Sequence, residues 1–519
     1  MPGNFYISTS IAYVNGTPHL GFALESIMSD AVARYQRMME RDTFFLTGTD
    51  EHGIKVYKTA QEQGMTTKEL CDKNSAEFQK LRGLLNLSTD DFIRTTDQKR
   101  HWPSVQKLWG KLAENGDIDK KKYEGLYCEG CETFLPEKDL MDGNCPIHKK
   151  PPVKVSEENY FFKLSKYSDQ ILRAIESKEL EIVPEFRQNE IVAMLRDGGL
   201  KDVSFSRPSD TLPWGIPVPE DASQNMYVWC DALSNYISAL NYANKGENYQ
   251  KYWIDAERVH VIGKDIVRFH VGIWIGMLFS ANIPLPNKIF IHGFLTSEGQ
   301  KMSKSLGNVV DPFKEVELYG ADALRYFLLS QVPVGQDYDF TRAQFENIYN
   351  AHLANNLGNL VNRISVLCEK NEITPAMIPS ENTVSTPAFF AKLTTTWAMA
   401  LGVPEIPGQA MAQFNLHLAL GKIWELLDFL NKQMDEHKPW ILAKTDPEKL
   451  KDIMPLFLES MRQVSYMLDP FIPETAQKIR TILGVHTAKT LDEKTTWNGQ
   501  SHEWHQLGEK QILFPRLEK

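Results

Sequence analysis

Two lysines past the middle of the chain and one histidine near its start have the residue types and spacing for phosphate chemistry. Lys301 and Lys304 lie in the run Lys301-Met302-Ser303-Lys304-Ser305, which is preceded by Gly299. This composition is typical of a mobile loop that can close over a polyphosphate and bring two point charges to it. His19 stands about 280 residues upstream, at the predicted start of a helix, where backbone N–H groups and the helix dipole favour anions. Two lysines alone would fit an ordinary solvated loop, but together with His19 they predict a site that neutralises phosphate charge.

A cluster of cysteines has the spacing of a metal site. Cys128-x2-Cys131 is followed, after thirteen residues, by Cys145-x2-His148. Three thiolates and one imidazole complete a tetrahedron, so the pattern predicts one closed, structural zinc site rather than a catalytic one. A redox CxxC motif is the alternative, but it lacks a βαβ context and leaves the second pair of residues unexplained.

The elements that must position these residues are predicted from hydrophobic periodicity. Residues 5–10 are expected to form a buried strand, residues 18–41 a helix and residues 43–47 a second strand. Strand, helix and strand within 50 residues form a βαβ unit, which predicts a parallel sheet. Ligands collect beyond the carboxyl ends of such strands, and both the loop from Ile11 to His19 and Asp50 follow strand ends.

The domain organisation follows from where this α/β pattern stops and resumes. The pattern covers residues 1–115 and 225–285, whereas residues 116–224 carry the cysteine cluster and two proline-rich bends and are expected to form an inserted domain. Residues 286–345 hold the lysine loop, and residues 346–519 have the long apolar periodicity of an α-helical bundle. The predicted fold class is therefore α/β, with a split parallel-sheet domain followed by a helical domain.

Composition limits the possible partners and compartments. The net charge is −10, so a nucleic-acid partner would have to bind a local basic patch. No apolar run approaches 18 residues, which predicts no membrane span. Six cysteines in 519 residues are too few for a disulfide scaffold, and Met1-Pro2-Gly3-Asn4 runs straight into the first strand without a leader, so we expect a cytoplasmic protein. The three scattered cysteines, Cys71, Cys230 and Cys368, are expected to be small buried hydrophobes.

Several motifs together resemble the methionyl-tRNA synthetases, a family of class I aminoacyl-tRNA synthetases, over essentially the whole chain. The motifs are Tyr13-Val14-Asn15-Gly16-x-Pro18-His19-Leu20-Gly21, Gly48-Thr49-Asp50-Glu51-His52-Gly53, Tyr227-Val228-Trp229-x-Asp231-Ala232, Gly263-Lys264-Asp265-x-x-x-Phe269-His270, the lysine run and Leu513-Phe514-Pro515-Arg516. The resemblance implies a Rossmann-like catalytic domain, a zinc-bearing connective insertion, a stem-contact domain with the lysine loop and an anticodon-binding bundle. It also implies ATP-dependent attachment of L-methionine to methionine tRNA through methionyl-adenylate, with magnesium accompanying ATP. We expect a monomer, because no dimerising module follows the helical region.

The resemblance also assigns expected roles to residues. His19, Lys301 and Lys304 would be catalytic and, with Gly21, Gly263 and Asp265, would bind ATP. The methionine site would comprise Ile11, Tyr13, Asp50, Trp229, Leu233, Tyr236, Ile266, Phe269 and His270, with Asp50 pairing with the α-ammonium group. Asn359, Arg363 and Trp440 would read the anticodon, and Cys128, Cys131, Cys145 and His148 would hold a single zinc ion. Without the resemblance, most of the pocket residues would be interpreted as core and the anticodon residues as surface.

One departure from the family pattern suggests an alternative function. Phe22 stands where the first signature usually carries a second histidine, and an aromatic ring cannot donate a hydrogen bond to phosphate. The loss of one charge-assisted bond costs roughly 1.5–3 kcal/mol. An inactive paralogue that only binds tRNA is therefore the alternative, although the lysine run, Asp50 and Asp265 favour an active enzyme. At position 233, leucine replaces the proline expected from the family.

Relatives specific for other amino acids are the nearest enzymatic alternatives. Enzymes for isoleucine, valine or leucine carry a separate editing domain, for which an insertion of about 110 residues is short. A cysteine-specific enzyme would place zinc in the amino-acid pocket, whereas the predicted ligands lie in the insertion. Methionine is therefore the expected substrate.

Overall fold

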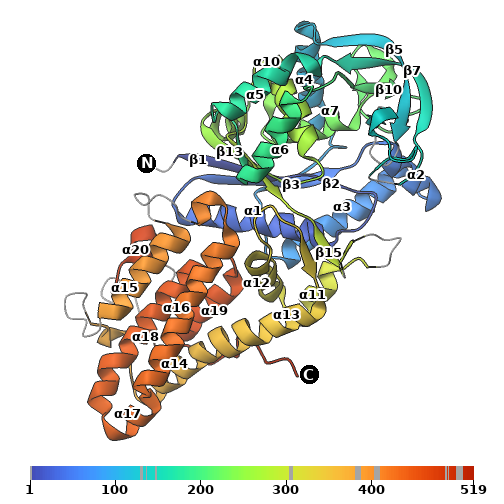
Figure 1. Cartoon of the computed structure of the whole chain (residues 1–519). Coiled ribbons are helices and arrows are strands. Elements are labelled where there is room, and N and C mark those ends of the chain that lie inside the picture. The colour runs from blue at the N-terminus through green and yellow to red at the C-terminus, as the bar shows by residue number, and fades with distance from the viewer. Residues whose placement is uncertain are drawn as a thin grey trace.

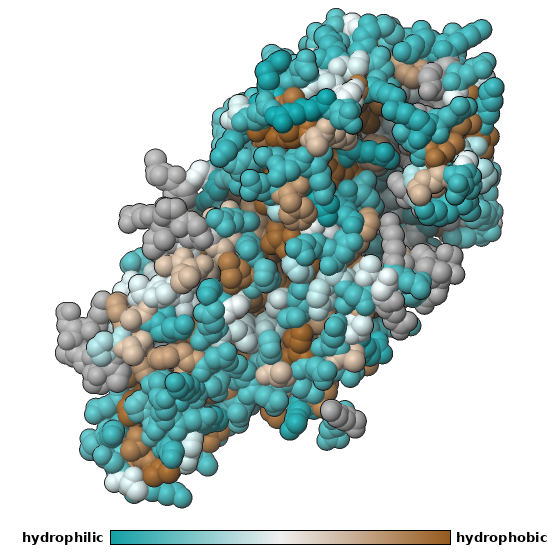
Figure 2. Space-filling view, viewed as in Figure 1, coloured by the Kyte–Doolittle hydropathy of each residue, from teal (hydrophilic) through white to brown (hydrophobic). Residues whose placement is uncertain are grey.

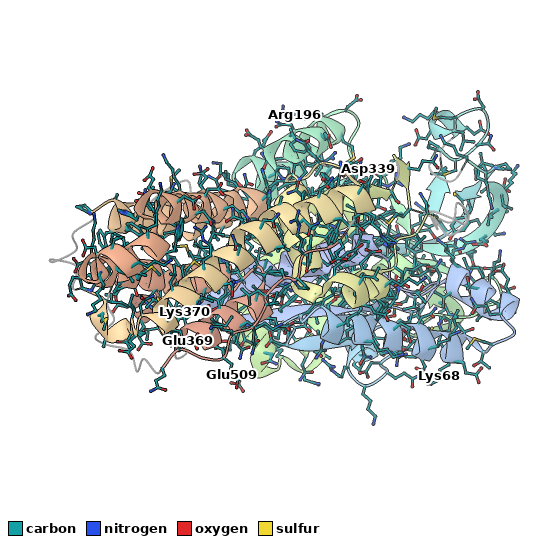
Figure 3. The ribbon with its side chains drawn as sticks, turned by 90° about the horizontal axis from the view of Figure 1, so that it is seen from below. Lys68, Arg196, Asp339, Glu369, Lys370 and Glu509 are labelled. Carbon is teal, nitrogen blue, oxygen red and sulfur yellow. The ribbon has the colours of Figure 1, made fainter. Side chains whose placement is uncertain are left out.

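A parallel sheet lies across the middle of an elongated molecule, with helices and small sheets on one side and a helical bundle on the other (Figure 1). The computed structural model describes residues 3–128, 133–135, 137–146, 149–297, 299–302, 308–379, 387–402, 410–485, 488, 490–497 and 506–518. Charged side chains such as Lys68, Arg196 and Lys370 lie at the periphery (Figure 3). The face seen in Figure 2 is correspondingly mostly hydrophilic.

The central sheet has the strand order β2-β3-β1-β13-β14-β8, with β4 added beside β3, and every pair is parallel. Its strands are β1 (Asn4–Thr9), β2 (Ala12–Tyr13), β3 (Thr43–Asp50), β4 (Asp91–Arg94), β8 (Glu181–Val183), β13 (Ala256–Gly263) and β14 (Lys288–His292). Alternation along β1 sends Phe5 and Ile7 into the core on the side of α1 and Tyr6 into the core on the opposite side. Since β3 and β13 lie on opposite sides of β1, the topological switch point falls between β1 and β13, where ligands are expected.

Helices cover both faces of this sheet. They are α1 (Leu20–Met38), α2 (Ile54–Glu62), α3 (Thr67–Leu84), α4 (His101–Glu114), α7 (Val228–Leu233), α8 (Asn235–Ser238), α9 (Glu247–Tyr249) and α10 (Ile275–Ala281), with the π-helical segments η4 (Gln250–Ile254) and η5 (Phe269–Trp274). Helix α1 packs on β1, β3 and β13 through Leu20, Leu24, Ile27 and Ala31, which recur at helical spacing and are fully buried. The βαβ unit predicted from the sequence is confirmed.

Residues 118–226 add two small sheets, ordered β6-β5-β7-β9 and β10-β12-β11. Their elements are β5 (Ile118–Cys128), β6 (Thr133–Leu135), β7 (Val153–Phe162), β9 (Val203–Ser204), β10 (Ser206–Pro208), β11 (Pro217–Val218) and β12 (Asp221–Met226), together with α5 (Ser168–Glu176) and α6 (Glu185–Arg196). Strand β8 also falls inside the range 116–224, yet it pairs with β14 at the edge of the main sheet. Part of the expected insertion therefore belongs to the catalytic sheet.

A third small sheet, ordered β16-β15-β17, follows β14 and carries the start of the lysine run. Its elements and the helices after it are β15 (Leu295–Ser297), β16 (Gln300–Lys301), β17 (Tyr338–Phe340), α11 (Pro312–Tyr319), α12 (Ala321–Gln331) and α13 (Arg342–Ile348). Strand β15 pairs in parallel with β17 and antiparallel with β16.

The C-terminal third is helical, as predicted. Its elements are η7 (Tyr349–Gly358), α14 (Asn359–Lys370), α15 (Pro387–Thr396), η10 (Trp397–Leu401), α16 (Leu416–His437), α17 (Pro439–Thr445), α18 (Pro447–Leu468), α19 (Pro473–Leu483) and α20 (Leu491–Thr495). The fully buried Arg325 of α12 joins this bundle to the sheet, because it pairs with Asp30 of α1 at 2.7 Å and donates to the carbonyl oxygen of Phe471 at 2.7 Å. Among the described residues, no helix has the length and apolar content needed to cross a membrane.

Candidate active site

His19 lies at the start of α1, on the loop that follows β1. It is the N-cap of the helix, and its Nδ1 accepts a hydrogen bond from the backbone N–H of Gly21 at 3.1 Å. A Cβ at position 21 would lie 3.0 Å from the His19 ring, so the glycine leaves room for the imidazole to fold back over the first turn. With Nδ1 accepting, the neutral ring carries its proton on Nε2. Nε2 can therefore donate to an anion held at the helix N-terminus.

The chain that follows the lysine run returns to the same helix end. The backbone N–H of Leu20 donates to the carbonyl oxygen of Val310 at 3.2 Å. Lys301 ends β16 and its backbone lies opposite Thr296 of β15. The Lys301 side chain and all of Lys304 lie outside the described residues. The backbone nevertheless brings the start of α1 and the lysine-bearing segment together, although the two are far apart in sequence.

A buried polar cluster surrounds the carboxyl ends of β1 and β14. The Glu25 carboxylate accepts from the backbone N–H and the hydroxyl of Ser10, at 2.8 and 2.6 Å, and pairs with Nε2 of His292 at 2.8 Å. Burial alone would lower the pKa of His292, but the hydrogen bond and the charge of Glu25 outweigh burial and raise it. Sequence reasoning missed these residues because an isolated serine, glutamate and histidine carry no diagnostic spacing.

Asp265 lies just beyond the end of β13 and is exposed. Its Oδ1 would be 2.9 Å from a Cβ at position 263, so Gly263 allows this carboxylate to turn back over the strand end. The neighbouring Lys264 is directed elsewhere, because its Nζ pairs with Asp337 at 2.6 Å and lies over the ring of Phe294. Lys264 therefore does not take the place of the histidine missing at position 22.

Asp50 is the last residue of β3 and is nearly buried. Its carbonyl oxygen accepts from the backbone N–H of Val14 at 3.1 Å, and its backbone lies opposite Tyr13 of β2 in the parallel pair. A carboxylate at a strand end, beside the loop that follows β1, is suited to pair with an ammonium group.

Aromatic side chains of α7, α8 and η5 cluster at the predicted methionine pocket. Trp229 of α7 stacks on Phe269 of η5, with ring centroids 3.9 Å apart and an interplanar angle of 11°. Tyr236 of α8 and His270 of η5 form the polar side, with the Tyr236 hydroxyl 2.7 Å from Nε2 of His270. Aromatic faces suit a polarizable thioether. The structure therefore brings together four of the residues that sequence analysis assigned to the methionine site.

Hydrogen bonding fixes which nitrogen of His270 carries the proton and the direction of its bond with Tyr236. Nδ1 of His270 lies 3.0 Å from the carbonyl oxygen of Ile266, which can only accept, so Nδ1 carries the proton. Nε2 then accepts from the Tyr236 hydroxyl. Burial lowers the pKa of His270 to about 4, and burial also raises the pKa of Tyr236 well above its usual value. Both groups are therefore neutral near pH 7.

The remaining predicted pocket residues lie around these rings. Leu233 is buried in the last turn of α7, and Ile11, Tyr13 and Ile266 are partly buried and pack against the same core. Leu233 thus takes part in the hydrophobic packing, at a position where the family pattern has proline.

Phe22 packs away from the helix end as part of the hydrophobic core. Its ring meets the ring of Phe78 of α3 edge to face, with centroids 4.8 Å apart and an interplanar angle of 85°. Sequence reasoning interpreted Phe22 as the loss of a phosphate donor. In the structure it is a packing residue between α1 and α3.

Comparisons with known proteins match the whole chain to one enzyme family. A family model described as "tRNA synthetases class I (M)" matches residues 5–151 and 137–365, and one described as "Anticodon binding domain of methionyl tRNA ligase" matches residues 408–518. The methionine–tRNA ligase of Brucella suis is 44% identical over 490 residues, covering 93% of this chain and 92% of the relative. That of Fusobacterium nucleatum is 41% identical and covers 100% of this chain and 80% of the relative.

A solved structure agrees with these sequence matches. The methionyl-tRNA synthetase of Mycobacterium tuberculosis, in complex with methionyl-adenylate, superposes with a TM-score of 0.90 at 37% identity and covers 99% of this chain. The chain belongs to the methionyl-tRNA synthetase family. It is a methionine–tRNA ligase that uses ATP to attach methionine to its tRNA, and the alternative of an inactive paralogue is not supported.

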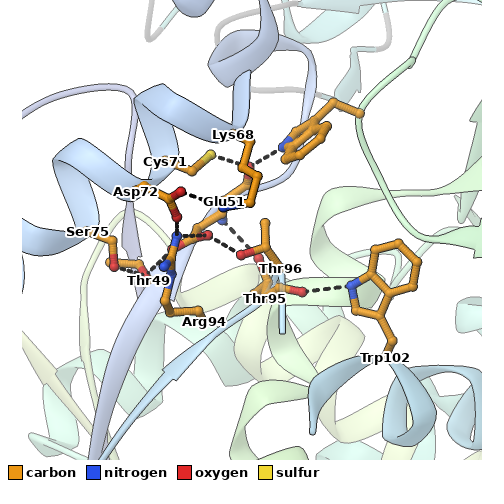
Figure 4. Close-up of polar contacts among 11 residues, drawn as sticks. Thr49, Glu51, Lys68, Cys71, Asp72, Ser75, Arg94, Thr95, Thr96 and Trp102 are labelled. Carbon is orange, nitrogen blue, oxygen red and sulfur yellow. Dashed lines mark hydrogen bonds and ion pairs between the residues drawn. The ribbon is translucent and has the colours of Figure 1, made fainter. Parts of the chain in front are cut away.

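In this methionyl-tRNA synthetase a charged network surrounds Glu51, the residue that follows Asp50 in sequence (Figure 4). The carboxylate of Glu51 is fully buried and accepts from Arg94 at 2.6 and 3.0 Å, from Thr49 at 2.7 Å and from Thr96. Arg94 also donates to Asp72 of α3 at 2.7 Å. Two bonds reach the Glu51 carbonyl oxygen, one of them from the indole N–H of Trp214 at 2.7 Å. Sequence reasoning recognised the motif around Asp50 but not the partners of the neighbouring Glu51, because Arg94 belongs to a different strand, β4.

The predicted zinc ligands of this synthetase are only partly described. Cys128 ends β5 and Cys145 begins a tight turn, in which the Lys149 backbone N–H donates to the Cys145 carbonyl oxygen at 2.8 Å. Both cysteines are buried, whereas Cys131 and His148 lie outside the described residues. No group of three potential ligands meets within the described part of the chain. The three scattered cysteines are buried, as predicted.

The predicted anticodon residues lie at the far end of the synthetase, on neighbouring helices. Asn359 and Arg363 share one face of α14, and the Arg363 guanidinium lies 5.0 Å from the ring centre of Trp440 in α17 and pairs with Asp435 at 2.8 Å. The Trp440 side chain is 40% exposed. Apolar side chains gather at this tip of the bundle in Figure 2, where Ile441 is also exposed.

Proposed function

We propose that the residues gathered at the start of α1 and at the ends of β3 and β13 form the catalytic site of this ligase. The methionine carboxylate attacks the α-phosphorus of ATP, forming methionyl-adenylate as the bond to pyrophosphate breaks. A ribose hydroxyl of the tRNA then attacks the acyl carbon, and AMP leaves. The observation that carries this proposal is the contact between Leu20 and Val310, because it joins the helix N-terminus to the segment that carries the two lysines.

Each part of the site has one role in this chemistry. His19 Nε2 donates to a phosphate oxygen, while Lys301 and Lys304 neutralise the charge that builds up as pyrophosphate leaves. Gly21 and Gly263 leave room for the nucleotide, and Asp265 binds its ribose. Magnesium arrives with ATP.

Asp50 pairs with the methionine ammonium group, which aligns the carboxylate for attack. The methionine side chain lies against the stacked rings of Trp229 and Phe269, with the polar side of the pocket at the thioether. Ile11, Tyr13, Leu233 and Ile266 complete the walls. Because Tyr236 and His270 are neutral, these two groups present no charge that a lysine or glutamate side chain could pair with.

Outside the catalytic site, we propose one structural zinc ion, bound by Cys128, Cys131, Cys145 and His148. Buried thiols and an imidazole are the ligand set that zinc prefers, and when bound the ion would hold the tip of the insertion together.

Asn359, Arg363 and Trp440 are proposed to contact the anticodon, with Trp440 available for base stacking. We further propose a cytoplasmic monomer with domains divided as the sequence predicted, except that β8 belongs to the main sheet.

The proposed roles are tested by ATP–pyrophosphate exchange with methionine. His19→Ala and Lys304→Ala should each lower kcat at least 100-fold with little change in the KM for methionine, as expected for groups that act on charge developing in the transition state. Trp440→Ala should leave exchange unchanged and weaken only aminoacylation of tRNA. Unchanged exchange in His19→Ala would reject the assignment of the phosphate site.

A further inference from the structure

Asp231 is a fully buried carboxylate held between two histidines. Its Oδ2 lies 2.6 Å from Nδ1 of His52, and its Oδ1 lies 2.7 Å from Nε2 of His101, whose Nδ1 lies 2.7 Å from the Ser238 hydroxyl. Side-chain exposures of 3%, 1% and 0% for His52, Asp231 and His101 show that water does not reach these bonds. Burial alone would raise the pKa of Asp231, but the charge of His52 and the hydrogen bonds from both histidines lower it. Asp231 is therefore a carboxylate with a partner on each oxygen.

The two ends of this clamp, His52 and Asp231, each lie close in sequence to a residue of the proposed methionine site. His52 comes two residues after Asp50, and Asp231 comes two residues after Trp229 on α7. His101 is the first residue of α4, a helix that takes no other part in the site. The His52–Asp231 bond thus ties the turn that carries the ammonium-binding aspartate to the helix that carries the aromatic wall.

We propose that His52, Asp231 and His101 are positioning residues for methionine recognition: they set the distance between Asp50 and Trp229. This inference rests on the methionine site proposed above. The His52 side chain has space beside it, because His52, Trp102 and Trp214 line a cavity of about 490 Å³. The indole N–H of Trp102 is bonded to the Thr95 carbonyl oxygen and that of Trp214 to the Glu51 carbonyl oxygen, so neither donates to Asp231 in place of His52. Without the His52–Asp231 bond, α7 loses this tie to the turn after β3, which Arg94 still holds to β4 and α3.

The test compares two substitutions of one residue. His52→Ala removes the donor to Asp231, whereas His52→Asn keeps an N–H near the position of Nδ1. In ATP–pyrophosphate exchange, His52→Ala should raise the KM for methionine about tenfold, the effect of one lost bond to a charged group, while the KM for ATP changes less than about twofold. His52→Asn should recover most of this loss. His101→Ala should also raise the KM for methionine, but less than His52→Ala, because His101 bonds to Asp231 but does not lie in the turn that follows Asp50.

Two controls separate the inference from its premises. Glu459→Gln disrupts a buried pair with Arg462 in α18, and it should lower thermal stability without changing the KM for methionine. Asp50→Asn tests the pocket itself and should raise the KM for methionine more than any clamp variant. If Asp50→Asn raises that KM but His52→Ala does not, or if His52→Asn is no better than His52→Ala, the clamp proposal is rejected and the pocket stands. An unchanged KM in Asp50→Asn would overturn both.

Discussion

The aromatic pocket around Tyr236 and His270 and the ion-pair network around Glu51 use opposite electrostatics. In the pocket, burial lowers the pKa of His270 and raises that of Tyr236, so the polar groups are kept neutral and bonded to each other. One residue beyond Asp50, Glu51 is buried as an ion and its charge is met by Arg94. The difference follows from the roles of the two regions. A pocket for an uncharged thioether must hold no free charge. The Glu51 network, called the frame, can instead use strong charge-assisted bonds to fix the turn after β3.

The largest loss of stability is expected when the frame around Glu51 loses the guanidinium group of Arg94. Arg94→Met would leave the Glu51 carboxylate buried without its counter-charge, which typically costs about 3–5 kcal/mol of stability. Arg100→Met is the matched control, because Arg100 pairs with Asp91 at the surface and should cost about 0–1 kcal/mol. Urea-induced unfolding, followed by tryptophan fluorescence, measures both. Equal losses in the two variants would contradict a special role for the buried network.

Acid should destabilise the pocket before it affects the frame. The unfolded chain protonates His270 near pH 6.5, but the folded protein does so only near pH 4, so the unfolded state binds more protons between these values. Stability therefore falls as pH drops from about 6.5 to about 4, and His270 alone accounts for roughly 3 kcal/mol of that loss.

His270→Gln tests this pH dependence, because its amide oxygen can still accept from Tyr236 and the side chain does not titrate. The stability of the variant should fall less steeply than that of the parent over this range, and chemical denaturation at a series of pH values measures the difference. Parallel curves would show that His270 does not carry the effect.

A smaller loss is expected from Tyr236→Phe. The ring and its stacking on His260, at 3.9 Å between centroids, remain, but Nε2 of His270 loses its donor. One unsatisfied buried acceptor costs about 1–3 kcal/mol. The KM for methionine should rise more than the KM for norleucine, which lacks the sulfur. A uniform rise for both amino acids would place the hydroxyl outside thioether recognition.

The smallest catalytic effect is expected at position 22. Phe22→His should change kcat/KM for ATP by less than about threefold, because the side chain packs on Phe78, and the lost aromatic pair should cost about 0.5–1.5 kcal/mol of stability. Exchange kinetics and thermal unfolding measure the two quantities. A gain of more than tenfold in kcat would show that this position faces phosphate after all.

The sequence predicted the parts of this molecule that depend on local pattern. Periodicity identified β1, α1 and β3, because apolar residues at period 2 and 3.6 report burial directly. It could not place β8, since three residues with one buried side chain look like a loop until β14 pairs with them.

Motif recognition likewise named the residues proposed to face the substrates but not the residues that hold them in place. Arg94, His101 and Glu25 come from separate elements and meet Glu51, Asp231 and His292 only after folding. Phe22 packs on Phe78, a contact that its residue type alone did not predict.

The central claim, that a neutral aromatic pocket and Asp50 together select methionine, is tested most directly by ATP–pyrophosphate exchange with a panel of amino acids. Methionine, isoleucine, leucine, valine and cysteine would be compared with the parent protein and with Asp50→Asn. The account predicts exchange with methionine alone in the parent and a large rise in the KM for methionine in the variant. Exchange with another member of the panel at a comparable kcat/KM, or an Asp50→Asn variant with unchanged kinetics, would contradict it.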